Sequence, residues 1–100
     1  MIKKSTSNFK KIAILISGSG TNLQAIIDAC EKKEINGQIS IVISNKKEAY
    51  GLERAKKSSI KTMVCTDNDL LLDTLKKEEI DLVVLAGYLK ILPQKIIDQY

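Results

Sequence analysis

The sequence predicts an α/β domain in which a parallel sheet is covered by helices on both faces. Four short apolar segments, rich in Ile, Val and Leu, alternate along the chain with segments of helical periodicity. The apolar segments lack the polar–apolar alternation of a half-exposed strand, which is typical of strands buried on both faces. With 100 residues, of which 44% are hydrophobic and 28% charged, the chain is long enough for one such domain.

The first half of the chain contains two strand–helix units. The first strand is expected at residues 12–16 and its helix at about residues 22–33. The apolar positions that recur at helical spacing in this helix are Leu23, Ile26, Ile27 and Cys30. A turn at Gly37 precedes a second, β-branched strand at residues 39–43. The second helix is then expected at about residues 48–58, where Glu53 and Arg54 should face solvent without a role.

The second half repeats the pattern. A short strand is expected at residues 62–65, followed by polar residues that can cap a helix running to about residue 79. The fourth strand is expected at residues 82–86. Pro93 suits the first turn of a last helix over residues 94–100. Crossovers between the parallel strands are expected to be right-handed.

Composition and charge exclude several classes of protein. No apolar run approaches the roughly 18 residues that a membrane helix needs. Residues 1–11 lack the apolar centre of a secretory signal and are expected to form a short mobile extension. The net charge of +4 comes from lysine pairs that are scattered along the chain. A nucleic-acid partner would require one coherent basic face, so none is expected.

The two cysteines give no indication of a metal site or a disulfide. Cys30 and Cys65 are far apart, and the chain has no histidine that could help to bind a metal. We expect both to be reduced, buried thiols of a cytoplasmic protein, because free cysteine usually behaves as a small hydrophobic residue.

The turn after the first strand is the strongest functional signal. It reads Ser-Gly-Ser-Gly-Thr-Asn over residues 17–22 and leads directly into a helix. Small residues at such a point leave main-chain N–H groups free at the positive end of the helix dipole, which is a ready site for an anion such as phosphate. Gly20, Thr21 and Asn22 are the candidate contacts. The alternative is an ordinary turn in which Thr21 or Asn22 caps the helix.

This turn does not match the common nucleotide fingerprints. A dinucleotide fingerprint requires a third glycine where the chain has Leu23, and the acidic residue expected after the second strand is missing. A P-loop requires a Gly-Lys-Ser/Thr sequence, which is absent. An NADP-binding domain that holds a 2′-phosphate with Ser44, Asn45 and Lys46 remains an alternative. A ligand-binding module without catalytic activity is another.

The turn after the fourth strand is the second functional signal. Gly87 permits close approach of a ligand or of another main-chain segment. Leu89, Ile91 and Leu92 could form the wall of an apolar slot. The alternative is a strand end that leads into a loop packed on the core.

Four blocks, in order, resemble the phosphoribosylglycinamide formyltransferase family. They are residues 17–27, 44–46, 50–55 and 83–92. The resemblance extends from about Lys11 to the end of the chain and corresponds to the N-terminal half of a family member. It implies an open sheet with strand order 3-2-1-4. The two signal turns would then meet where the strand order reverses, which is the usual ligand position in such sheets.

The resemblance also implies roles for individual residues. Gly20, Thr21 and Asn22 would contact the phosphate of phosphoribosylglycinamide, and Gly87 and Tyr88 would lie near this substrate. Four residues would hold the pterin of 10-formyltetrahydrofolate, namely Leu89, Lys90, Ile91 and Leu92. Lys90 replaces an arginine that is frequent in the family. No metal is implied.

The catalytic residues of the family are expected beyond Tyr100. They are an Asn and a His in an Asn-x-His-Pro motif, and a later Asp, and the present chain has no histidine. The chain is therefore expected to be one N-terminal portion without the catalytic half. The fourth strand would expose a free edge, through which the chain is expected to self-associate.

Overall fold

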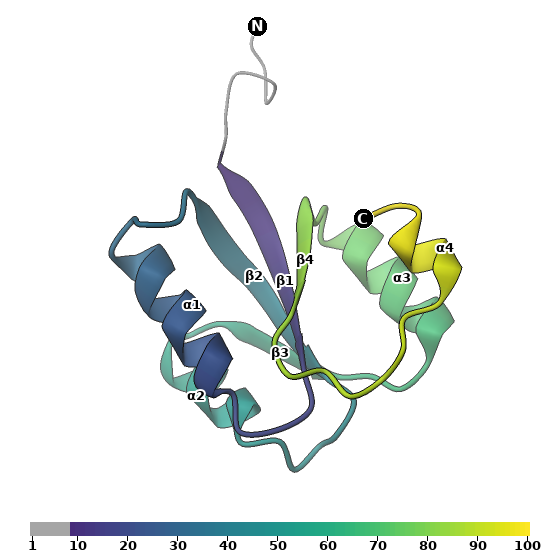
Figure 1. Ribbon diagram of the computed structural model, residues 1–100, viewed down its shortest axis with the longest axis horizontal. Coiled ribbons are helices and arrows are strands. Elements are labelled where there is room, and N and C mark those ends of the chain that lie inside the picture. Colours follow the sequence, from purple (N-terminus) through teal and green to yellow (C-terminus); the bar gives the residue numbers. More distant parts are fainter. Residues whose placement is uncertain (1–8) are drawn as a thin grey trace, which may run out of the picture.

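Four parallel strands form the middle layer of the computed structural model, which describes residues 9–100 (Figure 1). The strands are β1 (Lys10–Ile16), β2 (Gly37–Ser44), β3 (Lys61–Val64) and β4 (Leu82–Leu85). Their order in the sheet is β3-β2-β1-β4, and all three neighbouring pairs are parallel. The predicted fold class and strand order are confirmed.

Helices cover both faces of this sheet. The helices are α1 (Thr21–Glu31), α2 (Gly51–Lys57), α3 (Asn68–Lys77) and α4 (Gln94–Ile97). In Figure 1, α1 and α2 lie on one face of the sheet and α3 and α4 on the other. The loops at the carboxyl ends of the strands gather along one edge of the molecule, which is the lower edge in this view.

The sheet divides the interior into two hydrophobic cores. Ile12, Ile14 and Ile16 of β1 pack with Leu23 and Ile27 of α1 in the first core. The intervening β1 residues pack in the second core, together with residues of α3 and α4; these residues are Ala13, Leu15, Leu71, Leu75 and Ile96. Because both faces of β1 are buried, every position from 12 to 16 must be apolar, which explains the unbroken apolar run.

Some boundaries differ from those that periodicity predicts. β1 begins at Lys10, because the Lys10 N–H donates to the Asn36 carbonyl (3.0 Å) and the Lys11 N–H donates to Asp81 Oδ2 (2.8 Å). The two lysines therefore belong to the sheet, not to the predicted extension, whose residues 1–8 lie outside the described part. α2 begins at Gly51, three residues later than predicted, and α4 ends at Ile97.

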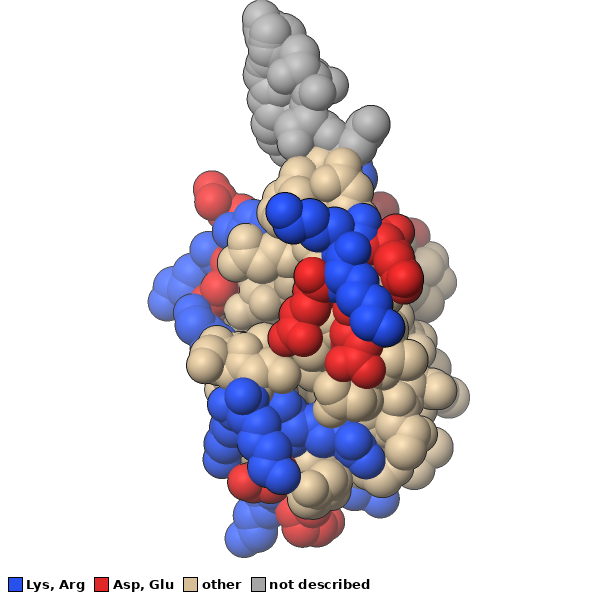
Figure 2. Space-filling model, turned by 90° about the vertical axis from the view of Figure 1, so that its left-hand side faces the viewer, with Lys and Arg blue, Asp and Glu red and all other residues tan. Residues whose placement is uncertain are grey.

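The surface carries charges of both signs. On the face shown in Figure 2, lysine and arginine side chains fall into separate groups with acidic side chains between them. Cys30 is partly buried and Cys65 is buried, and both are free thiols. Within residues 9–100, no helix is long and apolar enough to span a membrane.

Candidate functional site

The loops that follow β1 and β4 meet in a pocket of about 230 Å³. Its lining residues are Gly18, Ser19, Gly20, Thr21, Asn22, Ala86 and Gly87. β1 and β4 are neighbours in the sheet, although they are the first and last strands in sequence. The pocket therefore lies at the carboxyl ends of the strands, at the point where the strand order reverses.

Helix α1 begins at this pocket without a side-chain cap. Its N-cap residue is Gly20, with φ 79° and ψ 27°, and no side chain accepts a hydrogen bond from the first turn. The side chains of Thr21 and Asn22 are exposed and make no hydrogen bond to any residue between 9 and 100. The alternative in which Thr21 or Asn22 caps the helix is therefore wrong.

An uncapped helix start of this kind attracts an anion. The first N–H groups of a helix have no partner within the helix, and the dipole places a partial positive charge at them. The left-handed conformation of Gly20 turns successive N–H groups into the concave arrangement that binds phosphates. No acidic side chain stands in the first turn to oppose an anion. The geometry suits a single phosphate group.

Ser17 connects three strand ends beside the pocket. Its buried hydroxyl donates to Asn45 Oδ1 (2.5 Å) and accepts from the Leu89 N–H (2.9 Å). Asn45 follows β2 and Leu89 follows β4, so one hydroxyl fixes both loops to the end of β1. This role was not predicted, and the only signal in the sequence is a serine directly after an apolar strand.

Two of the three residues considered for a 2′-phosphate, Ser44 and Asn45, have side chains that are bonded elsewhere. Ser44 is fully buried, and its hydroxyl donates to the Lys46 carbonyl (2.7 Å) and accepts from the Lys46 N–H (2.9 Å). The side-chain oxygen Oδ1 of Asn45 accepts from the Ser17 hydroxyl. These bonds stabilise the turn after β2, so the structure favours a structural interpretation of this segment.

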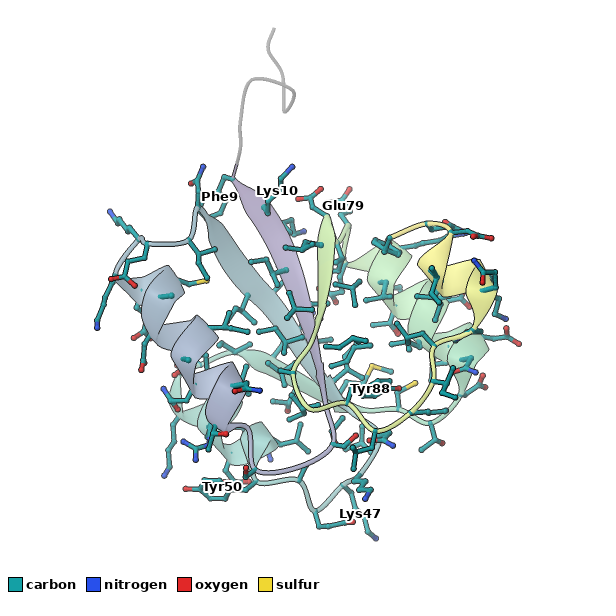
Figure 3. All side chains as sticks on the ribbon, viewed as in Figure 1. Phe9, Lys10, Lys47, Tyr50, Glu79 and Tyr88 are labelled. Carbon is teal, nitrogen blue, oxygen red and sulfur yellow. The ribbon has the colours of Figure 1, made fainter. Side chains whose placement is uncertain are left out.

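Gly87 reaches the pocket, whereas Tyr88 does not line it. Gly87 has φ 74°, and a Cβ built on it meets no atom within 4 Å. The ring of Tyr88 packs against the second core, on the α3 side of the sheet (Figure 3). Desolvation there, and to a smaller extent the nearby Cys65 thiol, raises the pKa of Tyr88 above its ordinary value. Of the predicted substrate contacts, Gly20, Thr21, Asn22 and Gly87 come together.

The four residues predicted for the folate alternate in direction. The side chains of Leu89 and Ile91 are 76% and 91% exposed, whereas Leu92 packs on the second core. The Lys90 ammonium group donates to the Thr66 carbonyl. The main-chain groups of residues 90–92 make no hydrogen bond within the described chain. The segment therefore presents two apolar side chains and a row of free peptide groups, and none of the four lines the 230 Å³ pocket.

The start of α2 supports the glycine-rich loop from the other side. The Gly51 N–H donates to the Gly18 carbonyl (3.0 Å), and Arg54 Nε donates to the Ser19 carbonyl (2.8 Å). The prediction that Arg54 faces solvent without a role is wrong. Its partner is 35 residues away, so no local pattern reveals the contact.

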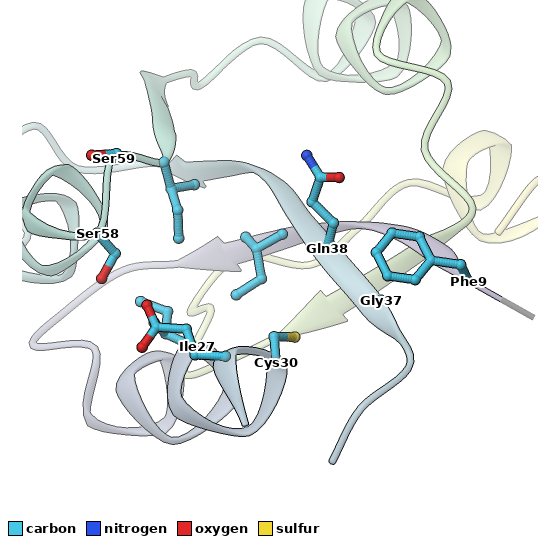
Figure 4. Close-up of a pocket in the computed structure, with 10 residues that line it drawn as sticks. Phe9, Ile27, Cys30, Gly37, Gln38, Ser58 and Ser59 are labelled. Carbon is cyan, nitrogen blue, oxygen red and sulfur yellow. The ribbon is translucent and has the colours of Figure 1, made fainter. Parts of the chain in front are cut away.

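A larger pocket of about 360 Å³ lies elsewhere (Figure 4). It is lined by the end of α1, the start of β2 and the residues after α2, including Cys30, Gly37 and Ser59. Burial raises the pKa of the Cys30 thiol. This pocket is at the amino end of β2, away from the strand ends where open parallel sheets bind ligands. The smaller pocket is therefore the better candidate site.

Comparison with known proteins gives consistent results. The formyl transferase family profile matches residues 10–100. The chain is 48% identical to the phosphoribosylglycinamide formyltransferase of Haemophilus influenzae, over 91% of this chain and 47% of the relative. It is 43% identical to the Escherichia coli enzyme of the same name, over 89% and 46%. The chain thus spans about half the length of the curated relatives it matches.

Solved structures agree with the sequence relatives. Glycinamide ribonucleotide transformylase 1 from Symbiobacterium toebii aligns with a TM-score of 0.88 at 36% identity, over 92% of this chain and 48% of that one. Phosphoribosylglycinamide formyltransferase from Anaplasma phagocytophilum aligns with a TM-score of 0.83 at 39% identity, over 89% and 44%. The predicted family resemblance is confirmed.

Proposed function

We propose a function from one premise, which is that this chain belongs to the formyl transferase family. The complete protein is a phosphoribosylglycinamide formyltransferase of purine biosynthesis. It transfers a formyl group from 10-formyltetrahydrofolate to the amine of phosphoribosylglycinamide, in the cytoplasm. The names and identities of the relatives support this reaction.

The pocket between the β1 and β4 loops carries the proposal. There the substrate phosphate accepts hydrogen bonds from the N–H groups of Gly20, Thr21 and Asn22, from the Thr21 hydroxyl and from the Asn22 amide. The supporting observation is an uncapped helix start whose polar side chains are exposed and free. Each charge-assisted bond of this kind contributes about 1.5–3 kcal/mol. Gly87 leaves room for the remainder of the substrate. Tyr88 is the next residue along the chain and lies near the substrate in this proposal.

The segment after Gly87 binds the folate in this proposal. A pterin is a flat ring system with hydrogen-bonding groups along its edge. The free peptide groups of residues 90–92 can pair with that edge, while Leu89 and Ile91 cover the ring. Lys90 contributes through its main chain, because its ammonium group already donates to Thr66. When bound, the folate supplies the formyl group.

The chemical step needs groups that we place outside this chain. Attack of the amine on the formyl carbon produces an oxyanion that must be stabilised and a proton that must be removed. The family's Asn, His and Asp would perform these tasks from residues beyond Tyr100 in a longer protein. The 100-residue chain alone is therefore expected to give no turnover in a formylation assay, and substantial turnover would contradict this part of the proposal.

Small molecules are the proposed ligands, and self-association the proposed protein contact. β4 is an edge strand, and the side chains of Leu82 and Leu85 on it are 44% and 52% exposed. Unpaired edge strands tend to pair with a second copy. No nucleic-acid partner is proposed, because lysines and acidic residues are mixed over the face shown in Figure 2.

Titration of the ¹⁵N-labelled chain with phosphoribosylglycinamide tests the site. We expect amide shifts concentrated at residues 19–22 and at Gly87. A parallel titration with NADPH is the control for the alternative. Shifts confined to the larger pocket, or NADPH binding below about 10 μM without binding of phosphoribosylglycinamide, would overturn the proposal.

A further inference from the structure

We propose that Arg54 is a positioning residue, which holds the main chain of the glycine-rich loop in the orientation that binds phosphate. This inference depends on the proposed phosphate site and explains how that site is kept in shape without a ligand. It is based on a pair of hydrogen bonds from α2 to two successive carbonyl groups of the loop. The Gly51 N–H donates to the Gly18 carbonyl oxygen, and Arg54 Nε donates to the Ser19 carbonyl oxygen.

Fixing a carbonyl group also fixes the N–H of the next residue. In a planar trans peptide the C=O and the following N–H point in opposite directions. With the carbonyls of Gly18 and Ser19 bonded to α2, the N–H groups of Ser19 and Gly20 point away from α2. The helix packs on the β2 and β3 side of the sheet, whereas β4 lies beyond β1. The two N–H groups therefore point to the side where Ala86 and Gly87 complete the pocket.

Without Arg54, the Ser19–Gly20 peptide could rotate. Gly20 restricts rotation less than any other residue, because glycine has no side chain. A rotated peptide would present the Ser19 carbonyl oxygen to the phosphate in place of the Gly20 N–H, which replaces attraction by repulsion. Arg54 is itself held in place, since its guanidinium lies over the Tyr50 ring at 5.2 Å.

Two glycines allow the close fit between α2 and the loop. A Cβ on Gly20 would lie 2.7 Å from Gly51 Cα and 3.3 Å from Arg54 Cδ. A Cβ on Gly51 would lie 2.5 Å from Ile16 Cδ1. The two glycines let the loop and the helix approach closely enough for the Arg54 side chain to reach Ser19.

Three variants separate a hydrogen-bonding role from a charge effect. Arg54→Met removes both the charge and the Nε–H donor, and Arg54→Lys keeps the charge but has no N–H at the Nε position. Lys57→Gln is the matched control, because Lys57 is on the same helix and over the same ring, at 5.8 Å, and has no hydrogen bond to the loop. The measurements are the dissociation constant for phosphoribosylglycinamide, the ligand-free amide shifts of Ser19 and Gly20, and the thermal midpoint.

We expect both Arg54 variants to weaken binding about tenfold, as loss of a charge-assisted hydrogen bond predicts, and to shift both amides without ligand. Lys57→Gln should do neither, and all three variants should keep a wild-type midpoint within a few degrees. Wild-type affinity in Arg54→Lys would show that charge alone acts and would overturn the inference, as would unchanged ligand-free shifts. If the wild type binds no phosphoribosylglycinamide, the proposed function fails, and the ligand-free shifts still report whether Arg54 orders the loop.

Discussion

At the residue scale, the candidate site depends on residues that lack side chains as much as on those that have them. Gly20 adopts φ 79°, which costs an L-residue roughly 1–2 kcal/mol, and it touches α2 where a Cβ would collide with Gly51. Gly18, two positions earlier, has no atom within 4 Å of a Cβ built on it. Backbone conformation and packing thus require glycine at position 20 and not at position 18.

We predict that Gly20→Ala lowers the free energy of unfolding by at least about 1–2 kcal/mol, because it adds backbone strain and a clash at once. Gly18→Ala introduces the same methyl group in open space and should change the free energy of unfolding by less than about 0.5 kcal/mol. Urea unfolding of the two variants beside the wild type provides the measurement. Equal losses would mean that the loop does not pack on α2 as described.

The sequence revealed the site residues whose chemistry is local. Gly20, Thr21 and Asn22 stand together at a strand–helix junction, so that short-range reasoning was sufficient to select them. Ser17 and Arg54 were missed, since their roles come from contacts with residues 28 to 72 positions away. Such contacts can be predicted only when the order of the strands in the sheet is known. Tyr88 was selected through the family resemblance, and the structure packs its ring against the second core.

At the scale of elements, the helices differ in how they begin. Asp67 caps α3, accepting from the N–H groups of Asp69 (2.9 Å) and Leu70 (3.4 Å) with one carboxylate oxygen. α1 has no such cap. A helix whose first turn is satisfied by a side chain has no need of an external anion, whereas α1 begins at the pocket with its first turn open.

Replacing the α3 cap should therefore cost stability. We expect Asp67→Ala to lower the free energy of unfolding by about 1 kcal/mol, the usual value for loss of an N-cap. Asp73→Ala removes an exposed carboxylate from the middle of the same helix and should not lower it, because alanine favours helices. Thermal or urea unfolding compares the pair. A loss in Asp73→Ala as large as that in Asp67→Ala would argue against the cap.

Periodicity predicted the existence and order of the elements better than their limits. The buried strands stand out because both faces of the sheet are covered. The start of α2 was misplaced, since residues 45–50 form a turn stabilised by Ser44, and a side-chain bond of that kind leaves no periodic trace. The predicted start of β1 lies too late in the sequence. Lys10 and Lys11 pair with β2 at the margin of the sheet, but in the sequence they resemble a polar extension.

At the scale of the whole molecule, β4 is one of the two edges of the sheet and carries exposed apolar side chains. We predict that the chain self-associates as its concentration rises, and that Leu85→Lys on β4 reduces this association, because a charge on an edge strand opposes pairing. Leu70→Lys is the control, since Leu70 lies on α3 and is 47% exposed, close to the 52% of Leu85. Light scattering across a concentration series gives the result. A wild-type chain that stays monomeric throughout would contradict the prediction.

The central place of β1 determines how the molecule can open. Its main chain pairs with β2 on one side and β4 on the other, and its side chains fill both cores. Solvent reaches its peptide groups when β1 separates from β2 or β4, and the side chains of β1 that are buried on both faces of the sheet oppose that separation. The amide protons of Ile14 and Leu15 should therefore be among the last to exchange for deuterium. The loop that lines one side of the candidate pocket follows directly from this strand, so the pocket should keep its shape until the strand itself opens.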